Sequence, residues 1–303
     1  MKIAYANKTF AALEEYNNEL LAKRPRTRSW LSNVFFVVSA DIVGVAEGLE
    51  AGAVIGTALG AATGGTGLVV VEAACGAICG SAASAAAAKG IGCSIVATPT
   101  QLNKFGVLST DIFAANIKTG DDFKNKWNKF PFNSAFNKIN LPQKFEYLRR
   151  IGEDHNGIIM AALSNEKRTT SPYIYSNEDL VNVIPPTIEE YRNIKEKLLG
   201  NPYFQIIYNE MFDNIKASYD GDFNPKLYLQ YSRIESINVK RLLSLLMEAY
   251  EMYPNDIDDI AEVVNHYTAI MEKNNELTER EKMIIYGALT VSLYSPQLWN
   301  NFE

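Results

Sequence analysis

Six glycines recur at every fourth position between Gly44 and Gly64, and this repeat constrains the fold more than any other feature of the chain. On an α-helix, a four-residue spacing places them along one slowly drifting stripe. Each interior glycine costs about 1 kcal/mol of helix propensity relative to alanine, so a second backbone must pack on the stripe closely enough to offset that cost. The stripe consists of Gly44, Gly48, Gly52, Gly56, Gly60 and Gly64.

A second stripe of small residues follows a glycine-rich turn and supplies the expected packing partner. The turn is the cluster from Thr63 to Gly67. The second stripe consists of Gly76, Gly80, Ser84 and Ala88, again four residues apart. Helices with small residues at this spacing associate through close backbone contact. The sequence therefore predicts a glycine-zipper helical hairpin over about residues 40–88.

The hairpin carries few charges, which makes a lipid bilayer one expected partner. Uncharged runs cover residues 51–71 and 73–88, and the first is long enough to span a hydrocarbon core. Most of the side chains are small, so the gain from insertion per residue is small. Acidic residues oppose insertion while they are ionised, and protonation at low pH lowers that cost. These residues are Asp41, Glu47, Glu50 and Glu72.

A cluster of four cations and a tryptophan precedes the hairpin. Apolar residues at three- and four-residue spacing predict an amphipathic helix over residues 5–23, which ends before Pro25. Cations beside a tryptophan are typical of a membrane surface, where each cation gains about 1 kcal/mol near anionic lipid. A solvated loop is the alternative interpretation. The cluster consists of Lys23, Arg24, Arg26, Arg28 and Trp30.

Helical periodicity continues beyond the hairpin, so the predicted fold class is all-α, with a Gly/Ala-rich helical hairpin followed by a multi-helix domain. Three parts are expected: residues 1–98 with the N-terminal helix and the hairpin, a connector with short helices over 99–142, and an all-helical domain over 143–303. Capping boxes at Thr187–Glu190 and Thr278–Glu281 mark two helix starts. The expected helices of the last part are 143–164, 177–183, 187–199, 203–219, 235–252, 256–273 and 279–294. Prolines expected at helix starts or stops are Pro186, Pro202, Pro254 and Pro296.

Charge and cysteine content argue against nucleic-acid, metal and cofactor binding. The first 100 residues carry seven basic and seven acidic side chains, so the formal net charge of −6 belongs to residues 101–303. Nucleic-acid binding normally requires a basic face, and neither part is basic. No histidine neighbours Cys75, Cys79 or Cys93, which we interpret as small buried residues rather than metal ligands. The sequence contains no phosphate-binding loop or catalytic motif, so no cofactor is expected.

His155 is the main candidate for catalysis, because the chain has only two histidines and His266 has fewer polar neighbours in sequence. His155 shares a helical face with apolar residues and follows Glu153 and Asp154, so a general base oriented by a carboxylate is conceivable. Adjacent carboxylates on a helix point in different directions, and these two are weak candidates for that reason. A buried, hydrogen-bonded core histidine is the favoured interpretation, and no enzyme is predicted.

Two short strings resemble an uncharacterised group of bacterial proteins of the Bacteroidota: IGEDHN from Ile151 to Asn156 and GALTVSLYSPQLW from Gly287 to Trp299. Members of that group often carry a similar Ala/Gly-rich segment with an aspartate shortly before its first glycines, as the string SADIVG from Ser39 to Gly44 has here. The Ala/Gly-rich segment also resembles glycine-zipper bacteriocin precursors, although those precursors are short peptides and this chain has 303 residues. The resemblance implies a bacterial origin and no catalytic residue.

Three functions are compatible with these features. The leading hypothesis is a membrane-associated or membrane-active protein, bacteriocin-like or toxin-like, that inserts the hairpin while the acidic helical domain keeps it soluble or guides it. The alternative is a soluble helical scaffold or interaction protein whose hairpin packs on its own second domain or, through the glycine stripe, on a second copy. The third is an enzyme that uses His155. No cleavable signal peptide is evident, and a membrane-associated or exported location is favoured over a cytoplasmic one.

Overall fold

The regular secondary structure in the part of the chain that the computed structural model describes is helical, except for one antiparallel pair of two-residue strands. The described residues are 6–23, 32–60, 66–90, 139–165, 198, 201–220, 222–252 and 257–299. The predicted all-α fold class is therefore confirmed. In chain order the elements are α1 (Asn7–Lys23), α2 (Ser32–Gly60), α3 (Thr66–Gly90), the 3-10 helix η1 (Gln143–Leu148), α7 (Arg149–Asn165), α10 (Pro202–Ala217), β1 (Tyr219–Asp220), β2 (Asp222–Phe223), α11 (Pro225–Tyr231), α12 (Ile237–Met252), α13 (Ile257–Asn274) and α14 (Glu279–Trp299).

Several helix boundaries agree with the signals in the sequence. At the start of α14, the Thr278 N–H donates to Glu281 Oε2 at 2.8 Å and the Glu281 N–H donates to Thr278 Oγ1 at 3.2 Å, which is the predicted capping box. Pro202 opens α10 behind the cap residue Asn201. The helix expected at 177–183 and all of 187–199 except residue 198 lie outside the described residues.

Two features of the last part differ from the sequence prediction. Helix α11 was not expected, although Asn224 caps it by accepting from the Lys226 and Leu227 N–H groups and Pro225 follows the cap. Pro296 was expected to end a helix and instead lies inside α14. Proline lacks the N–H that would donate to the Ser292 carbonyl, so α14 loses one backbone hydrogen bond, and only three helical residues follow the proline.

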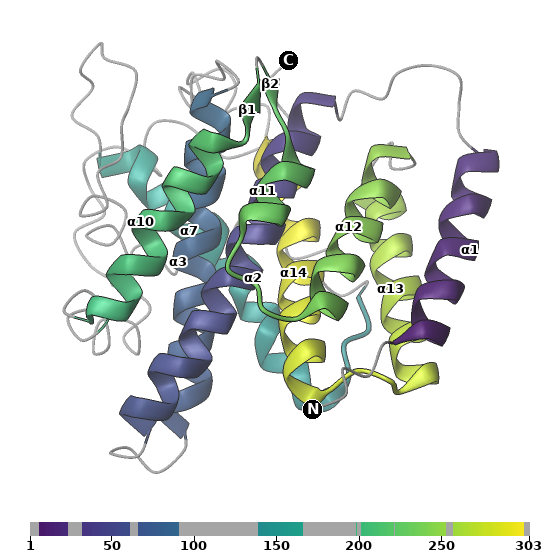
Figure 1. The fold of residues 1–303 in the computed structure, drawn as a ribbon, viewed down its shortest axis with the longest axis horizontal. Helices are drawn as coiled ribbons and strands as arrows, with labels where there is room; N and C mark the ends of the chain where they lie inside the picture. The colour runs from purple at the N-terminus through teal and green to yellow at the C-terminus, as the bar shows by residue number, and fades with distance from the viewer. Residues whose placement is uncertain are drawn as a thin grey trace.

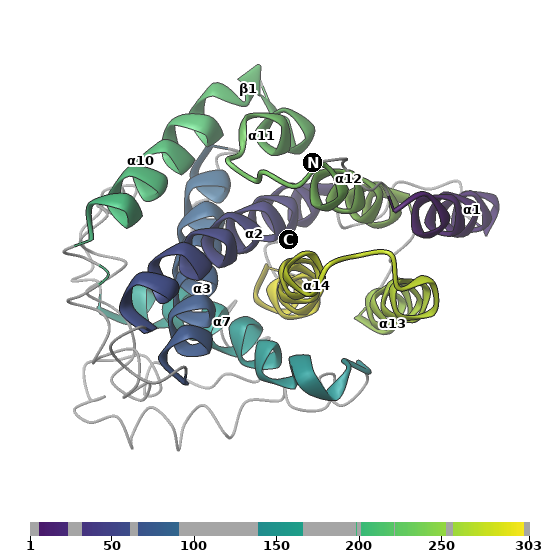
Figure 2. The same ribbon diagram turned by 60° about the horizontal axis from the view of Figure 1, so that its bottom comes forward.

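Helices α2 and α3 form the predicted hairpin, and α2 runs through the middle of the molecule (Figures 1 and 2). The first helix begins at Ser32, earlier than the expected residue 40. Figure 2 shows α2 between α3 on one side and α12 and α14 on the other. Residues 37–49 of α2 are all buried. This stretch of the hairpin is therefore covered by other helices of the same chain.

The glycines of α2 allow its backbone to touch that of α3. A Cβ atom added at Gly44 would lie 2.8 Å from the Cys79 carbonyl oxygen, and one added at Gly48 would overlap the Cys75 carbonyl oxygen. A Cβ atom added at Gly52 would lie 2.6 Å from a Cα atom of α3. Only a residue without a side chain permits this approach, which explains why glycine occupies these positions despite its low helix propensity.

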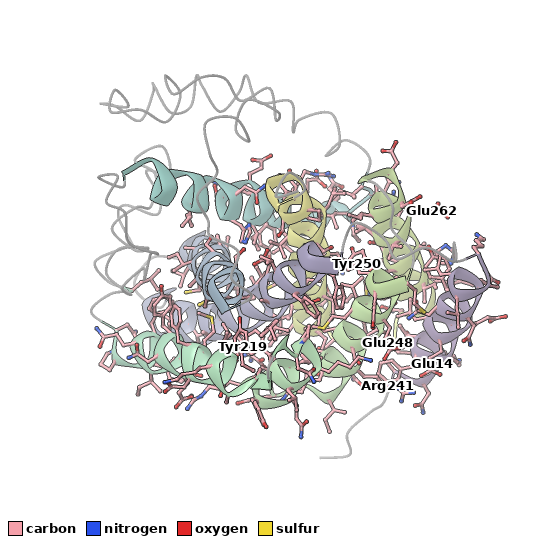
Figure 3. The ribbon with its side chains drawn as sticks, turned by 90° about the horizontal axis from the view of Figure 1, so that it is seen from above. Glu14, Tyr219, Arg241, Glu248, Tyr250 and Glu262 are labelled. Carbon is pink, nitrogen blue, oxygen red and sulfur yellow. The ribbon has the colours of Figure 1, made fainter. Side chains whose placement is uncertain are left out.

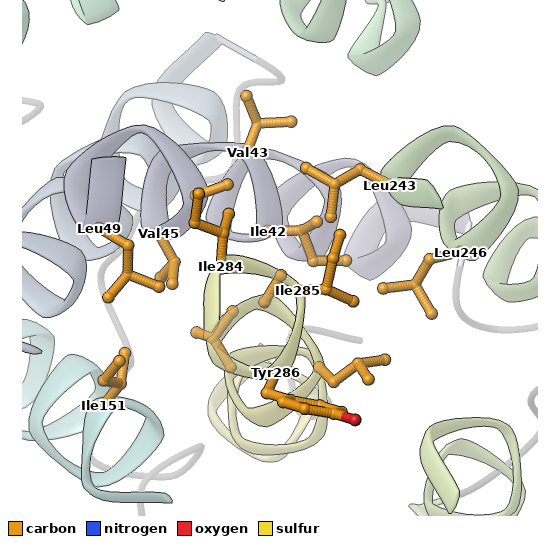
Figure 4. Packing of buried hydrophobic residues seen from close by; sticks show 14 of the residues in the cluster. Ile42, Val43, Val45, Leu49, Ile151, Leu243, Leu246, Ile284, Ile285 and Tyr286 are labelled. Atoms are coloured by element: carbon orange, nitrogen blue, oxygen red, sulfur yellow. The ribbon is translucent and has the colours of Figure 1, made fainter. Parts of the chain in front are cut away.

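Helix α14 packs against the face of α2 that α3 leaves free. Figure 4 shows Ile42, Val45 and Leu49 of α2 facing Ile284 and Ile285 of α14. These side chains are 0–1% exposed, and they belong to a continuous hydrophobic cluster that also includes residues of α1, α7, α12 and α13. Helices on both sides of residues 91–138 thus share one core. The predicted division at 1–98, 99–142 and 143–303 stays a prediction.

Helix α1 docks on α12 and α13 through a mixed polar and aromatic contact. The Arg241 guanidinium lies 2.5 Å from Glu14 and stacks 4.4 Å above the Phe10 ring centroid, and Figure 3 labels both charged residues. The Tyr16 ring stacks on His266 with 3.7 Å between centroids. His266, the second histidine of the chain, therefore helps to hold α1 in place.

The contact between α2 and α3 predicts a graded response to alanine. Gly48→Ala forces a Cβ atom onto the α3 backbone and should lower the free energy of unfolding by about 3 kcal/mol, against a propensity gain of about 1 kcal/mol. Gly76→Ala meets the flexible Leu49 side chain at 3.1 Å and should cost less. Urea unfolding followed by far-ultraviolet circular dichroism measures both. Equal stability of Gly48→Ala and wild type would contradict the backbone contact.

Candidate functional site

A fully buried polar cluster joins the first half of α2 to α7 and α14. Asp41 Oδ2 accepts a hydrogen bond from Ser295 and lies 3.5 Å from His155 Nε2. His155 Nδ1 lies 2.9 Å from Asn156 Oδ1, and Asn156 Nδ2 donates to the Tyr294 carbonyl oxygen at 2.9 Å. The side chains of Asp41, His155, Asn156 and Ser295 are each 0% exposed. We call these four residues the Asp41 cluster.

The contacts of the Asp41 cluster hold the imidazole of His155 in one orientation. The amide nitrogen of Asn156 donates to the Tyr294 carbonyl, so the amide oxygen faces His155 Nδ1. The other ring nitrogen, Nε2, faces Asp41 Oδ2. The imidazole is therefore held between a side chain of its own helix and one of α2.

Helix α3 also contacts the Asp41 cluster, through the backbone of His155. Ser81 of α3 donates to the carbonyl oxygen of His155 at 3.1 Å. Within the described residues, Asp41 Oδ1 and His155 Nε2 have no hydrogen-bond partner. Because the four side chains are inaccessible, a substrate could touch His155 only if these helices separated. The geometry is that of a structural clamp more than of an open catalytic site.

The weak catalytic candidates beside His155 point elsewhere. Glu153 accepts from the Tyr294 hydroxyl at 3.2 Å, and burial raises its pKa in spite of that bond. Asp154 forms an ion pair with Arg150 at 3.3 Å, one helical turn away. The two carboxylates diverge, as adjacent residues of a helix must. Neither orients the imidazole of His155, because the group that faces it is Asp41.

A second acidic site lies on α2 one turn and a half beyond Asp41. Glu47 accepts from the Tyr228 hydroxyl at 2.9 Å and from the Arg233 N–H at 2.8 Å, and its side chain is 3% exposed. Burial raises the pKa of Glu47 to about 7, because these two donors only partly offset the loss of water. Glu50 accepts from the Glu235 N–H at 3.2 Å, and burial raises its pKa as well.

The fourth acidic residue of the hairpin lines a cavity of about 600 Å³ between α2, α3, η1 and the start of α14. Glu72 is 6% exposed, and burial raises its pKa to about 7, with Arg280 opposing the shift. The cavity walls include Val54, Phe145, Tyr147 and Met283. Sequence patterns do not predict this cavity, because its lining residues come from four elements, two of which are more than 50 positions away from the hairpin.

The remaining predicted site residues are placed as follows. Gly56 is buried, Gly60 is the last residue of α2, and Gly64 lies outside the described residues. A Cβ atom at Gly76 would meet Leu49, and one at Gly80 would meet Val45. Lys23 ends α1 and is exposed. The residues of the cationic cluster that lie outside the described part are Arg24, Arg26, Arg28 and Trp30.

Cys75 and Cys79 are buried and free, as their small-residue setting suggested, and Cys93 lies outside the described residues. In the described part of the chain, His, Cys, Asp and Glu side chains do not gather in groups of three or more that suit a metal ion. Over the same residues, no helix combines the length and the apolar character needed to cross a bilayer.

Sequence reasoning singled out His155 but missed its partners. Asp41, Asn156 and Ser295 each lie in one of the three strings quoted above for their resemblance to bacterial proteins. The structure brings these three strings together at one buried point. No spacing rule predicts this meeting, because the residues are separated by more than 100 positions and meet only when α2, α7 and α14 pack.

Comparison with known proteins adds no assignment to this site. The chain matches no family model, no curated protein and no solved structure.

The buried contact between Asp41 and His155 predicts energetic coupling. Asp41→Ala and His155→Ala should each lower the free energy of unfolding by about 3 kcal/mol, because each leaves a buried polar group without its partner. The double variant should cost about 1–3 kcal/mol less than the sum. Chemical unfolding of the four proteins gives this coupling energy. Strict additivity would show that the two side chains do not interact.

The pKa of Glu47 predicts how stability depends on pH. Between about pH 4.5 and 7 the folded protein holds a proton on Glu47 that the unfolded chain has lost, so the free energy of unfolding rises as pH falls through that window. The gain over this window is about 3 kcal/mol; it is fully present below about pH 4.5 and is lost as pH rises through 7. Glu47→Gln should flatten this slope, and Glu262→Gln, at an exposed position of α13, should not. Thermal melts from pH 5 to pH 8 test both, and an unchanged slope in Glu47→Gln would contradict the assignment.

Proposed function

We propose that the chain is a helical scaffold or interaction protein and that the hairpin is the permanent centre of its own bundle. The observation that carries this proposal is that acidic residues of α2 bind groups from the second half of the chain. Asp41 accepts from Ser295, and Glu47 accepts from Tyr228 and the Arg233 backbone. Withdrawing α2 from the bundle would leave all of these groups unpaired, at a cost of about 1–3 kcal/mol each.

The glycine stripe supports the same function. Its members Gly44, Gly48 and Gly52 lie against the α3 backbone of the same chain, and Gly56 is buried. A second copy could reach the stripe only by displacing α3. Partners of such a scaffold would therefore bind on the outside of the bundle, while the hairpin supplies the rigid interior.

A membrane-active function is the second candidate, and a specific observation favours it. The hairpin is poor in charge, and burial brings the pKa of both Glu47 and Glu72 to about 7, so mild acid neutralises them. Neutral carboxyl groups are cheaper to place in lipid. Protonation also stabilises the folded bundle, however, because the same two groups are buried there. Lowering the pH therefore does not by itself favour transfer of the hairpin from the bundle into lipid.

Flotation with lipid vesicles separates the two functions. The variant Glu47→Gln/Glu72→Gln imitates the protonated hairpin at neutral pH. The matched control Glu248→Gln/Glu262→Gln removes the same net charge from α12 and α13, at the positions labelled in Figure 3. Vesicles of phosphatidylethanolamine and phosphatidylglycerol loaded with dye are tested at pH 5.0 and pH 7.5. A scaffold stays with the soluble fraction, is monodisperse without detergent and releases no dye in either variant.

The opposite pattern would replace the proposal by the second candidate. It consists of flotation and dye release by wild type at pH 5.0 and by Glu47→Gln/Glu72→Gln at pH 7.5, with no response from the control variant. Flotation of all variants alike at pH 7.5 would also contradict the scaffold, because it would make lipid binding independent of the buried carboxyl groups.

A further inference from the structure

The cavity beside Glu72 has the size and the walls of a small-molecule site. Its volume of about 600 Å³ lies within the range of 300–1,000 Å³ that is usual for ligand pockets. Phe145 of η1 and Met283 of α14 form apolar walls and are 5% and 6% exposed. Val54 of α2 faces the same space and is 44% exposed, which is high for an apolar side chain in a core helix. Apolar surface is therefore open for contact.

Two opposite charges line this cavity without satisfying each other. Among the described residues, no donor forms a hydrogen bond with the Glu72 carboxyl group, although its side chain is more than nine-tenths buried. Arg280 influences Glu72 electrostatically, and its hydrogen bond to a described residue is a long one, 3.4 Å, to the Glu50 carbonyl oxygen. Glu279 at the rim is already paired with Lys144 at 2.5 Å. Glu72 is thus a buried carboxyl group without a described donor, and Arg280 is an exposed guanidinium at the mouth of the same cavity whose only hydrogen bond to a described residue is long.

We propose that this pocket binds a small zwitterion with an apolar side group, the chemistry of a hydrophobic α-amino acid. Its ammonium group donates to Glu72, its carboxylate accepts from Arg280, and its side group lies on Val54, Phe145 and Met283. Charge-assisted hydrogen bonds of this kind are about twice as strong as neutral ones and are strongest away from water. A simple amine would leave Arg280 unpaired, and a simple carboxylate would leave Glu72 unpaired, so both should bind more weakly.

The pH dependence of binding follows from the groups that face Glu72. They are Arg280 and Glu279 from α14, Tyr147 from η1 and Cys75 on α3, while the lining residues of α2 carry no charge. Glu279 is paired with Lys144. Burial raises the pKa of Glu72 to about 7, so a tenth of the protein carries the ionised group at pH 6. Affinity for the zwitterion should therefore fall by about tenfold between pH 8 and pH 6.

Isothermal titration of the full chain at pH 8 tests the site with L-leucine and L-phenylalanine. Two analogues of leucine, 4-methylpentanoate and 3-methylbutylamine, lack the amine and the carboxylate respectively. We expect an amino acid to bind and both analogues to bind at least tenfold more weakly. Glu72→Gln and Arg280→Gln should each weaken binding by about tenfold or more, because each removes a charge-assisted bond. The control Glu248→Gln, on the distant α12, should bind like wild type.

Several outcomes would overturn the site. The site is excluded if neither amino acid binds, or if Glu72→Gln binds the amino acid as tightly as wild type does. Equal binding of 3-methylbutylamine and leucine would make it a cation site rather than a zwitterion site. Circular dichroism of each variant shows whether it folds. If Arg280→Gln does not fold, Arg280→Lys takes its place, and this variant should keep part of the affinity because it keeps the positive charge. Vesicle flotation and ligand binding are separate measurements, so the failure of one leaves the other intact.

Discussion

The contact of two helix backbones at Gly44, Gly48 and Gly52 is the constraint on which the rest of the structure depends. It removes side chains from one face of α2, so that the adhesion between α2 and α3 comes from close packing of backbone atoms rather than from large apolar groups. Both helices are then narrow, and the larger side chains on their other faces must find partners elsewhere. Helix α14 meets this need, with Leu49 of α2 filling the space above Gly287.

Burial of α2 creates an electrostatic problem that the C-terminal half of the chain solves. A helix in the middle of a bundle cannot expose its acidic groups, and a buried carboxylate is costly unless donors surround it. Backbone N–H groups of the loop at 233–235 and hydroxyl groups of Tyr228 and Ser295 provide those donors. Residues that weaken a membrane helix therefore act as attachment points between α2 and distant segments. This is the main physical reason for favouring a stable scaffold over an insertable hairpin.

Glu72 differs from the other acidic residues of the hairpin because no described donor serves it. Glu72 lines a cavity together with Arg280, and its pKa is raised because burial removes water from the carboxyl group. Asp41, by contrast, is enclosed in the bundle with His155, and both side chains are inaccessible to solutes. Accessibility, more than the identity of the side chains, separates a site that can bind a ligand from one that clamps helices together.

The sequence alone determined the helical class, the pair of helices that form the hairpin and several helix starts, because these follow from local signals: glycine spacing, the capping box at Thr278 and the proline at position 202. It also placed His155 in the interior. It did not predict the cap at Asn224 as a helix start, or the meeting of Asp41 with His155 and of Glu72 with Arg280. Those contacts join residues more than 100 positions apart. Only tertiary packing decides them, since hydrophobic periodicity reports which face of a helix is buried and not which helix covers it.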